Sequence, residues 1–272
     1  MPVLKRAESG LDWRLRTPRA ALVRWAAWFA LVALAAFSWR VMTEDTIWAF
    51  VVDAPEQAAD IADRMVPPRW DYMGKLWRPL WDTVSIATLG TLLAVVMGVP
   101  VAFLAARNTT PSAALVRPVA LLVIVSSRSI NALIWALLLV TIMGPGVAAG
   151  IVAIALRSIG FVGKLLYEAI EEIDQSQVEA VTAAGAGPAQ VMDYAIVPQI
   201  LPAFAGITVF RWDINIRESA VVGLVGAGGL GLQLESSLNV LAWPQVSLIL
   251  LVILATVLLS EWVSAKVRHA II

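Results

Sequence analysis

Two arginines inside apolar runs are the side chains of this sequence that could act on a substrate. Arg128 lies in the run 118–143 and Arg157 in the run 147–163, and neither run contains an acidic residue. At about 1.5 Å of rise per residue, each arginine is about 15 Å from one end of its run, near the middle of a bilayer. A charge there costs at least ~2.5 kcal/mol unless it faces a cavity or a partner. Such cations indicate an anionic passenger, and guanidinium geometry suits phosphate-like oxyanions. Pairing with a carboxylate elsewhere in the chain is the structural alternative, and the sequence leaves both open.

A second group of charges lies in the apolar segment that begins near Pro198. It contains Arg211, Asp213, Arg217 and Glu218, with Asn215 among them. Mutual pairing would explain these charges without any passenger. We nevertheless expect this segment to border the same pathway, whose candidate residues are Arg128, Asn131, Arg157, Arg211, Asn215 and Arg217.

A glycine-rich run, VGAGGLG at 225–231, follows this segment. Gly226, Gly228 and Gly231 satisfy the pattern G-x-G-x-x-G, but a dinucleotide site requires that pattern between a strand and a helix of a βαβ unit. No βαβ pattern occurs in the sequence, so we interpret the run as membrane structure, where glycines permit close packing and local unwinding. We expect Gly226, Gly228, Gly229 and Gly231 to form an outer gate.

Composition argues against most enzymatic chemistry. The chain has no cysteine and its only histidine is His269, so neither a transition-metal site nor a thiol nucleophile is expected. An intramembrane hydrolase would have to use a Ser–Lys or Asp–Asp pair, and no convincing pair is present. The chain also lacks a G-x-x-x-x-G-K-[ST] loop, so it cannot hydrolyse ATP itself. We therefore expect no catalytic residue, no metal and no cofactor bound by this chain.

Hydropathy predicts a chain that crosses a membrane several times. Hydrophobic residues make up 60% of the 272 residues, charged residues make up 15%, and the mean hydropathy is +0.80. The apolar runs predict about six transmembrane helices, at 25–42, 83–106, 118–143, 147–163, from 198 onward, and 245–263. Basic clusters place both termini in the cytoplasm, with 1–24 as a cytoplasmic tail. The external linker 43–82 ends in an aromatic stretch, Trp70 to Trp81, which is expected to form an interfacial helix.

The segment 164–197 is a polar island between the fourth and fifth predicted spans. Ser176 and Glu179 have the S-x-x-E spacing of a capping box, which predicts a helix start near Ser176. Gly185 permits a chain reversal, and Pro188 suits the first turn of a second helix. A helix-turn-helix in this position could transmit force between a soluble partner and the membrane helices.

The same island resembles the EAA loop of bacterial ABC-importer permeases. Four residues keep the spacing of that motif: Glu179, Ala180, Gly185 and Pro198. Three small apolar replacements depart from it: Val181, Ala195 and Val197. The resemblance implies that the loop couples the chain to an ATPase, by docking in a groove of that subunit.

Other stretches resemble the PhnE family, the permease subunits of phosphonate importers. They are MVPP at 65–68, SRSIN at 127–131, RWDINIRESA at 211–220 and VGAGGLG at 225–231. This resemblance implies an all-α polytopic membrane protein, with a type I ABC importer transmembrane domain over 80–265 and a cytoplasmic EAA coupling loop. It also implies a passenger that is phosphonate or a related oxyanion, such as phosphite, hypophosphite or phosphate. A permease for another small solute, such as an amino acid, is the alternative, and an ATP-independent secondary transporter is a more distant one.

The resemblance further implies the partners of the chain. Two cytoplasmic ATPase subunits would bind ATP and Mg, and a second permease subunit, identical or homologous, would complete the pathway. An extracytoplasmic binding protein would deliver the substrate, membrane lipid would surround the spans, and no nucleic acid would be bound. The implied location is the bacterial inner membrane, and the implied mechanism is alternating access.

Overall fold

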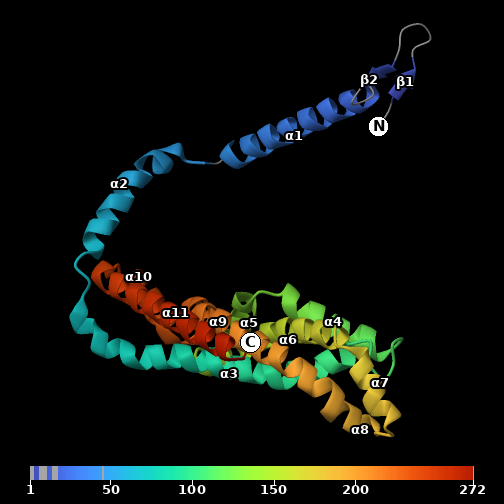
Figure 1. The fold of residues 1–272 in the computed structure, drawn as a ribbon. Helices are drawn as coiled ribbons and strands as arrows, with labels where there is room; N and C mark the ends of the chain where they lie inside the picture. Colours follow the sequence, from blue (N-terminus) through green and yellow to red (C-terminus); the bar gives the residue numbers. More distant parts are fainter. Residues whose placement is uncertain (1–2, 6–10, 14–17, 45, 272) are drawn as a thin grey trace. The chain divides into compact units, whose positions relative to one another are not determined.

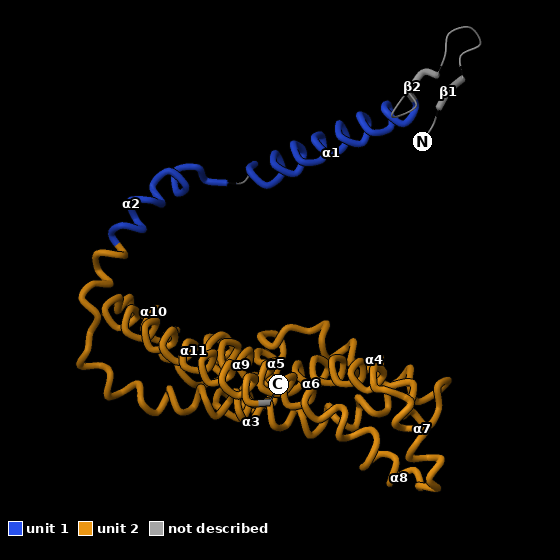
Figure 2. Tube along the Cα trace, in the orientation of Figure 1, with its two compact units in different colours: residues 1–60 blue, residues 61–272 orange. Residues whose placement is uncertain are grey.

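The chain forms two compact units. The computed structural model describes residues 3–5, 11–13, 18–44 and 46–271. The units are residues 1–60 and residues 61–272 (Figure 2). The elements of the first unit are the antiparallel strands β1 (Val3–Lys5) and β2 (Leu11–Trp13), helix α1 (Pro18–Glu44), and most of α2 (Trp48–Met65).

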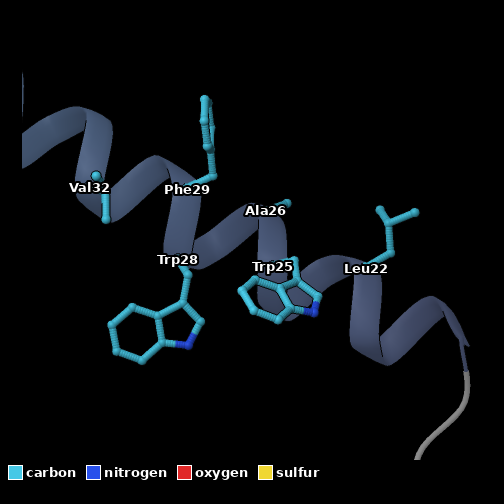
Figure 3. A pocket seen from close by; sticks show the side chains of 6 residues that line it. All are labelled: Leu22, Trp25, Ala26, Trp28, Phe29 and Val32. Carbon is cyan, nitrogen blue, oxygen red and sulfur yellow. The ribbon is translucent and has the colours of Figure 1, made fainter.

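Helix α1 has the properties of a membrane span. Residues Arg19–Glu44 have a mean hydropathy of 1.9, and none of the most apolar stretch is buried within the structure. The side chains of Trp28 and Phe29 point in opposite directions from the helix (Figure 3). A helix that is apolar all round is suited to lipid on every side. A helix long and apolar enough to cross a membrane therefore covers the predicted first span at 25–42, and it begins earlier, at Pro18.

The second unit is a bundle of helices (Figure 1). Its elements after α2 are η1 (Trp70–Tyr72), α3 (Met73–Ala105), α4 (Val116–Ser129), α5 (Ala132–Met143), α6 (Val147–Glu171), α7 (Gln175–Ala183), α8 (Pro188–Val191), η2 (Met192–Ile196), α9 (Val197–Val222), η3 (Gly223–Ala227), α10 (Gly229–Asn239) and α11 (Trp243–Ile271). Helix α6 packs against α3, α4, α5 and α9, so it is the element around which the bundle is built.

Small residues make this central position of α6 possible. A Cβ atom on Gly150 would lie 2.9 Å from the carbonyl oxygen of Ala227, and one on Gly160 would collide with the carbonyl of Ile124 in α4. Only glycine at these positions lets the neighbouring backbones approach so closely, which is a common basis of helix packing in membranes. Helix α6 therefore contacts the middle of α4 and the segment after α9 directly.

The third predicted span is not one continuous helix. Helices α4 and α5 meet at an angle of 87°, so a bent pair of helices covers the predicted third span at 118–143. Ile130 is extended, and Asn131 caps α5 by accepting a hydrogen bond from the N–H of Leu133. One helix therefore ends before Ile130, and a new helix begins after Asn131. The side chain of Asn131 stabilises that start, because it accepts a hydrogen bond from a backbone N–H that has no partner within the helix. The described residues contain five helices that could span a membrane, or six if this bent pair counts as one span, which confirms the predicted all-α fold.

The second span begins earlier than predicted. Helix α3 starts at Met73, where the sequence suggested about Thr83, and it continues through Pro79. The aromatic stretch from Trp70 to Trp81 therefore forms η1 and the first turns of α3, and its place at the membrane interface stays a prediction. Packing explains the difference, because buried Leu76 lies in a core cluster with residues of α10 and α11.

Candidate functional site

The polar residues of α9 divide between two faces of that helix. Arg211, Asn215 and Glu218 are spaced four and three residues apart, which places them on one face. This face lies toward α6 and α3. Asp213 and Arg217 lie on another face, where Asp213 accepts a hydrogen bond of 2.8 Å from Ser260 of α11 and pairs with Arg217.

Two arginines share one carboxylate between α6 and α9. Glu218 Oε2 accepts a hydrogen bond of 3.0 Å from Arg211 Nη2, and Glu218 Oε1 lies 3.2 Å from Arg157 Nε. We call Arg157, Arg211 and Glu218 the arginine cluster. Its formal charge is +1, because two guanidinium groups meet a single carboxylate. An ion cluster of this kind in a bundle interior must be fully hydrogen-bonded to be tolerated.

Arg211 is the fixed member of the arginine cluster. Its side chain is 2% exposed, its Nε donates to Ser158 Oγ at 2.9 Å, and its guanidinium lies 5.1 Å from the ring centre of Phe161. The network continues from Ser158 to Asn215 at 3.2 Å and from Asn215 to Thr91 of α3 at 2.7 Å. Arg211 and Asn215 are therefore held by α3, α6 and α9 together.

Arg157 has a counter-charge, contrary to the expectation from its own span. The counter-charge is the carboxylate of Glu218, which lies in α9, 61 residues after Arg157 in the sequence. A search for acidic residues within the predicted span 147–163 could not find it. The side chains of Arg157 and Glu218 are 30% and 20% exposed, whereas that of Arg211 is buried. The arginine cluster is thus accessible only at its Arg157 and Glu218 side.

Arg128 lies beside the same turn of α6, at the end of α4. The N–H of Gly160 donates to Ser127 Oγ at 2.8 Å, and the Ser127 hydroxyl donates to the carbonyl of Leu156. The stem of Arg128 covers Gly160, where a Cβ atom would lie 2.7 Å from Arg128 Cγ. Gly160 is three residues from Arg157 and shares its helix face. Arg128 is exposed and has no ion-pair partner within the part of the chain that the structure describes.

Two predicted pathway residues lie outside this group. Asn131 is exposed and its side chain caps α5, and Arg217 pairs with Asp213 on the α11 side of α9. The structure therefore brings together Arg128, Arg157, Arg211 and Asn215 around one turn of α6. Sequence reasoning missed Ser158 and Thr91, whose hydroxyls offer no signal inside an apolar run.

The predicted glycine gate is an irregular segment between α9 and α10. Gly226, Gly228 and Gly229 have φ values of 92°, 90° and 72°, a region that favours glycine. The N–H of Leu230 donates to Thr83 Oγ1 at 2.8 Å, and the carbonyl of Gly226 accepts from the N–H of Gly146 at 2.9 Å. The predicted unwinding is present. Its role as an outer gate remains a prediction, because these glycines, with Gly231 among them, are mostly buried.

The predicted helix-turn-helix is formed by α7 and α8. Its first helix begins at Gln175, with Asp174 as the cap, so the predicted capping box of Ser176 and Glu179 is wrong. Asp174 accepts hydrogen bonds from the hydroxyl and N–H of Ser176, at 2.7 and 2.9 Å, and these lower the pKa of its carboxyl group. Aspartate is as good a cap as serine and stands two residues earlier.

The turn between α7 and α8 has the predicted chemistry. Gly185 has a φ of 87°, and Pro188 is the first residue of α8. All four residues of the EAA resemblance are exposed: Glu179, Ala180, Gly185 and Pro198. We call these four residues the coupling surface, and its function remains a prediction.

Two further residues tie this region to the membrane helices, and sequence reasoning missed both. Gln199 Oε1 accepts a hydrogen bond of 2.9 Å from the N–H of Asp174, and its Nε2 donates to the carbonyl of Ala195 at 2.7 Å. Glu171 accepts from the N–H of Arg107 at 2.9 Å and lies 3.5 Å from Arg117. In the sequence, only the two basic residues that flank the loop between α3 and α4, Arg107 and Arg117, could have indicated the contact with Glu171.

The described residues contain no group of three or more histidine, aspartate or glutamate side chains that could hold a metal ion.

Comparisons with known proteins agree on one family. A family model for the "Binding-protein-dependent transport system inner membrane component" matches residues 98–269. The phosphite transport system permease protein PtxC of Stutzerimonas stutzeri is 40% identical over 261 residues, which are 95% of this chain and 90% of that protein. The phosphate-import permease protein PhnE of Mycolicibacterium smegmatis is 39% identical, over 84% of this chain and 43% of that protein. The inward-facing MetNI methionine ABC transporter has the same fold, with a TM-score of 0.65 and 23% identity over 75% of this chain and 99% of that one.

Proposed function

Because the chain belongs to the family of binding-protein-dependent transport system inner membrane components, we propose that it forms the membrane pathway of an importer for a phosphorus oxyanion. Phosphite, phosphonate and phosphate are the members of this substrate class that the names of its relatives support. The chain is a multi-pass membrane protein and a transport subunit, and ATP hydrolysis belongs to a separate subunit.

The observation that carries the proposal is the excess positive charge at one turn of α6. The arginine cluster has a formal charge of +1 and is accessible at Arg157, and Arg128 lies against Gly160 on the same helix face. Cations at membrane depth are costly and usually mark an ion or substrate pathway. Guanidinium groups also bind the oxygens of phosphorus oxyanions through paired donors. A small anion is therefore the passenger that fits this pathway.

The coupling surface supports an ATP-driven mechanism. Glu179, Ala180, Gly185 and Pro198 are exposed on or beside a helical turn, as a docking surface for an ATPase requires. In the proposed assembly, two ATPase subunits bind ATP and Mg, and each contacts one of two permease subunits. ATP binding would open the pathway toward an external binding protein, and hydrolysis would return it to the inward-facing state.

The orientation in the membrane follows from the basic residues near the two ends. Arg19 and Arg24 lie in the first turns of α1, and Lys266 and Arg268 lie near the end of α11. Positive residues are enriched in cytoplasmic segments, so both termini would be cytoplasmic. In a bacterium this places α7 and α8 on the inner side of the inner membrane.

Uptake into proteoliposomes tests the proposal. The permease is reconstituted with its cognate ATPase and binding protein, and ATP-dependent uptake of labelled phosphite, phosphate and a phosphonate is measured beside that of methionine. We expect uptake of at least one phosphorus oxyanion and no uptake without ATP. Uptake of methionine alone, or of any oxyanion in the absence of ATP, would contradict the proposal.

A further inference from the structure

Glu218 occupies the centre of the arginine cluster. We propose that Glu218 is a resident counter-ion, whose place at Arg157 is taken by the passing oxyanion while its carboxylate stays bound to Arg211. The inference rests on the proposed function, since it requires an anionic passenger. It assigns Glu218 a role in specificity for anions, beyond that of a structural ion pair.

The two arginines hold Glu218 in different ways. Arg211 is buried, and Ser158 and Phe161 fix its guanidinium in addition to Glu218. Arg157 is partly exposed, and Glu218 is the only side-chain partner of its guanidinium among the described residues. An arriving anion can therefore reach Arg157 but not Arg211. The contact between Glu218 and Arg157 is the one that can be exchanged.

The charges favour exchange over simple addition. Glu218 supplies the counter-charge of buried Arg211, whose desolvation would be costly beside the second cation, Arg157. If an oxyanion binds Arg157, Glu218 still neutralises Arg211, and every charge keeps a partner. The extra positive charge of the cluster is then balanced by the passenger.

Exchange also keeps the passenger weakly held. An oxyanion binds Arg157 only when Glu218 releases it. The attraction between the oxyanion and Arg157 is therefore largely offset by the lost attraction between Glu218 and Arg157. Arg128 has no ion-pair partner among the described residues, and its stem covers Gly160, three residues from Arg157, so its charge would attract the anion to this turn of α6. Weak holding is what a pathway needs, because a tightly bound anion would not be released.

The test compares the uptake kinetics of two variants with opposite expected effects. In Glu218→Gln, the carboxylate that competes with the passenger for Arg157 is gone, so KM for phosphite should fall. The expected change is about fivefold, which corresponds to the energy of a partly exposed ion pair, and the maximal rate should fall as well. In Arg157→Gln, the binding cation is gone while Glu218 keeps its pair with Arg211, so KM should rise by a similar factor. Glu261→Gln and Lys266→Gln, both exposed on α11, are matched charge controls and should leave KM unchanged.

A purely structural role predicts a different result. It would lower the membrane level or the maximal rate of both variants and leave KM unchanged, and that outcome would overturn the inference. If Glu218→Gln fails to assemble, Glu218→Asp keeps the charge that Arg211 needs but cannot reach both arginines. It should lower KM in the same direction, and an unchanged or raised KM would overturn the inference. Failure of the proposed function is seen separately, as an unmutated assembly that takes up no phosphorus oxyanion.

Discussion

The side chain of Gln199 joins the two ends of the α7–α8 segment, because its Oε1 accepts a hydrogen bond of 2.9 Å from the N–H of Asp174. Asp174 caps α7 just after α6 ends, and Gln199 lies in the first turn of α9. The entry and the exit of the α7–α8 segment are therefore linked by one side chain. A displacement of the coupling surface should reach α6 and α9 together.

We expect Gln199→Ala to weaken coupling between the ATPase and the membrane helices. The change removes the hydrogen bonds to Asp174 and Ala195, at a cost of about 1 kcal/mol each. The measurement is the ATPase rate with and without loaded binding protein, which should show a smaller stimulation at a normal membrane level. Gln177→Ala, on the exposed face of α7, is the matched control. Equal stimulation in the two variants would show that Gln199 has no part in coupling.

Substitution of the two turn glycines should separate backbone strain from side-chain bulk. Gly185 has a φ of 87°, so Gly185→Ala should destabilise the turn by about 1 kcal/mol and reduce the stimulated ATPase rate. Gly187 has a φ of −72°, and its alanine variant should retain coupling. Gly185→Trp adds bulk to the coupling surface and should abolish stimulation while membrane insertion remains intact. If stimulation survives in Gly185→Trp, this turn does not dock on the ATPase.

Arg128→Gln should slow oxyanion uptake without affecting assembly. Arg128 is exposed and has no ion-pair partner among the described residues, so its loss leaves no buried charge uncompensated. Arg211→Gln is the informative contrast, because it breaks a buried ion pair and should cost about 3–5 kcal/mol of folding free energy. Membrane level and uptake are measured in the same vesicles. Normal uptake by Arg128→Gln would remove this arginine from the pathway.

Single cysteines test the proposed orientation, since the chain has none of its own. Cysteines at Gly226 to Gly231 are poor reporters, because a Cβ atom at Gly229 would lie 2.5 Å from Thr83 Oγ1. Val240, which follows α10, is 71% exposed and should react with an impermeant thiol reagent from outside. Tyr194, at the end of the α7–α8 segment, is 74% exposed and should react only from the cytoplasmic side. The reverse pattern would overturn the orientation.

The sequence predicted those features that depend on local patterns. Apolar runs of span length predicted most of the membrane helices, and Gly185 and Pro188 predicted the turn between α7 and α8. The break between α4 and α5 was missed because no glycine or proline marks it, and polar Asn131 was interpreted as a pathway residue. The arginine cluster was predicted only as a list of charges. Its pairing depends on how α9 packs against α6, which no local pattern encodes.

The contact of Glu171 with Arg107 and Arg117 has a consequence for how the protein is made. While the chain is being inserted, the positive charges of the loop between α3 and α4 would help to keep that loop in the cytoplasm. After folding, the backbone of Arg107 and the side chain of Arg117 bind Glu171 at the end of α6. The same loop would thus act first as a topology signal during biosynthesis and later as a brace for the helix that carries Arg157. Replacement of these arginines could therefore cause two distinct defects, one in newly made chains and one in the mature transporter.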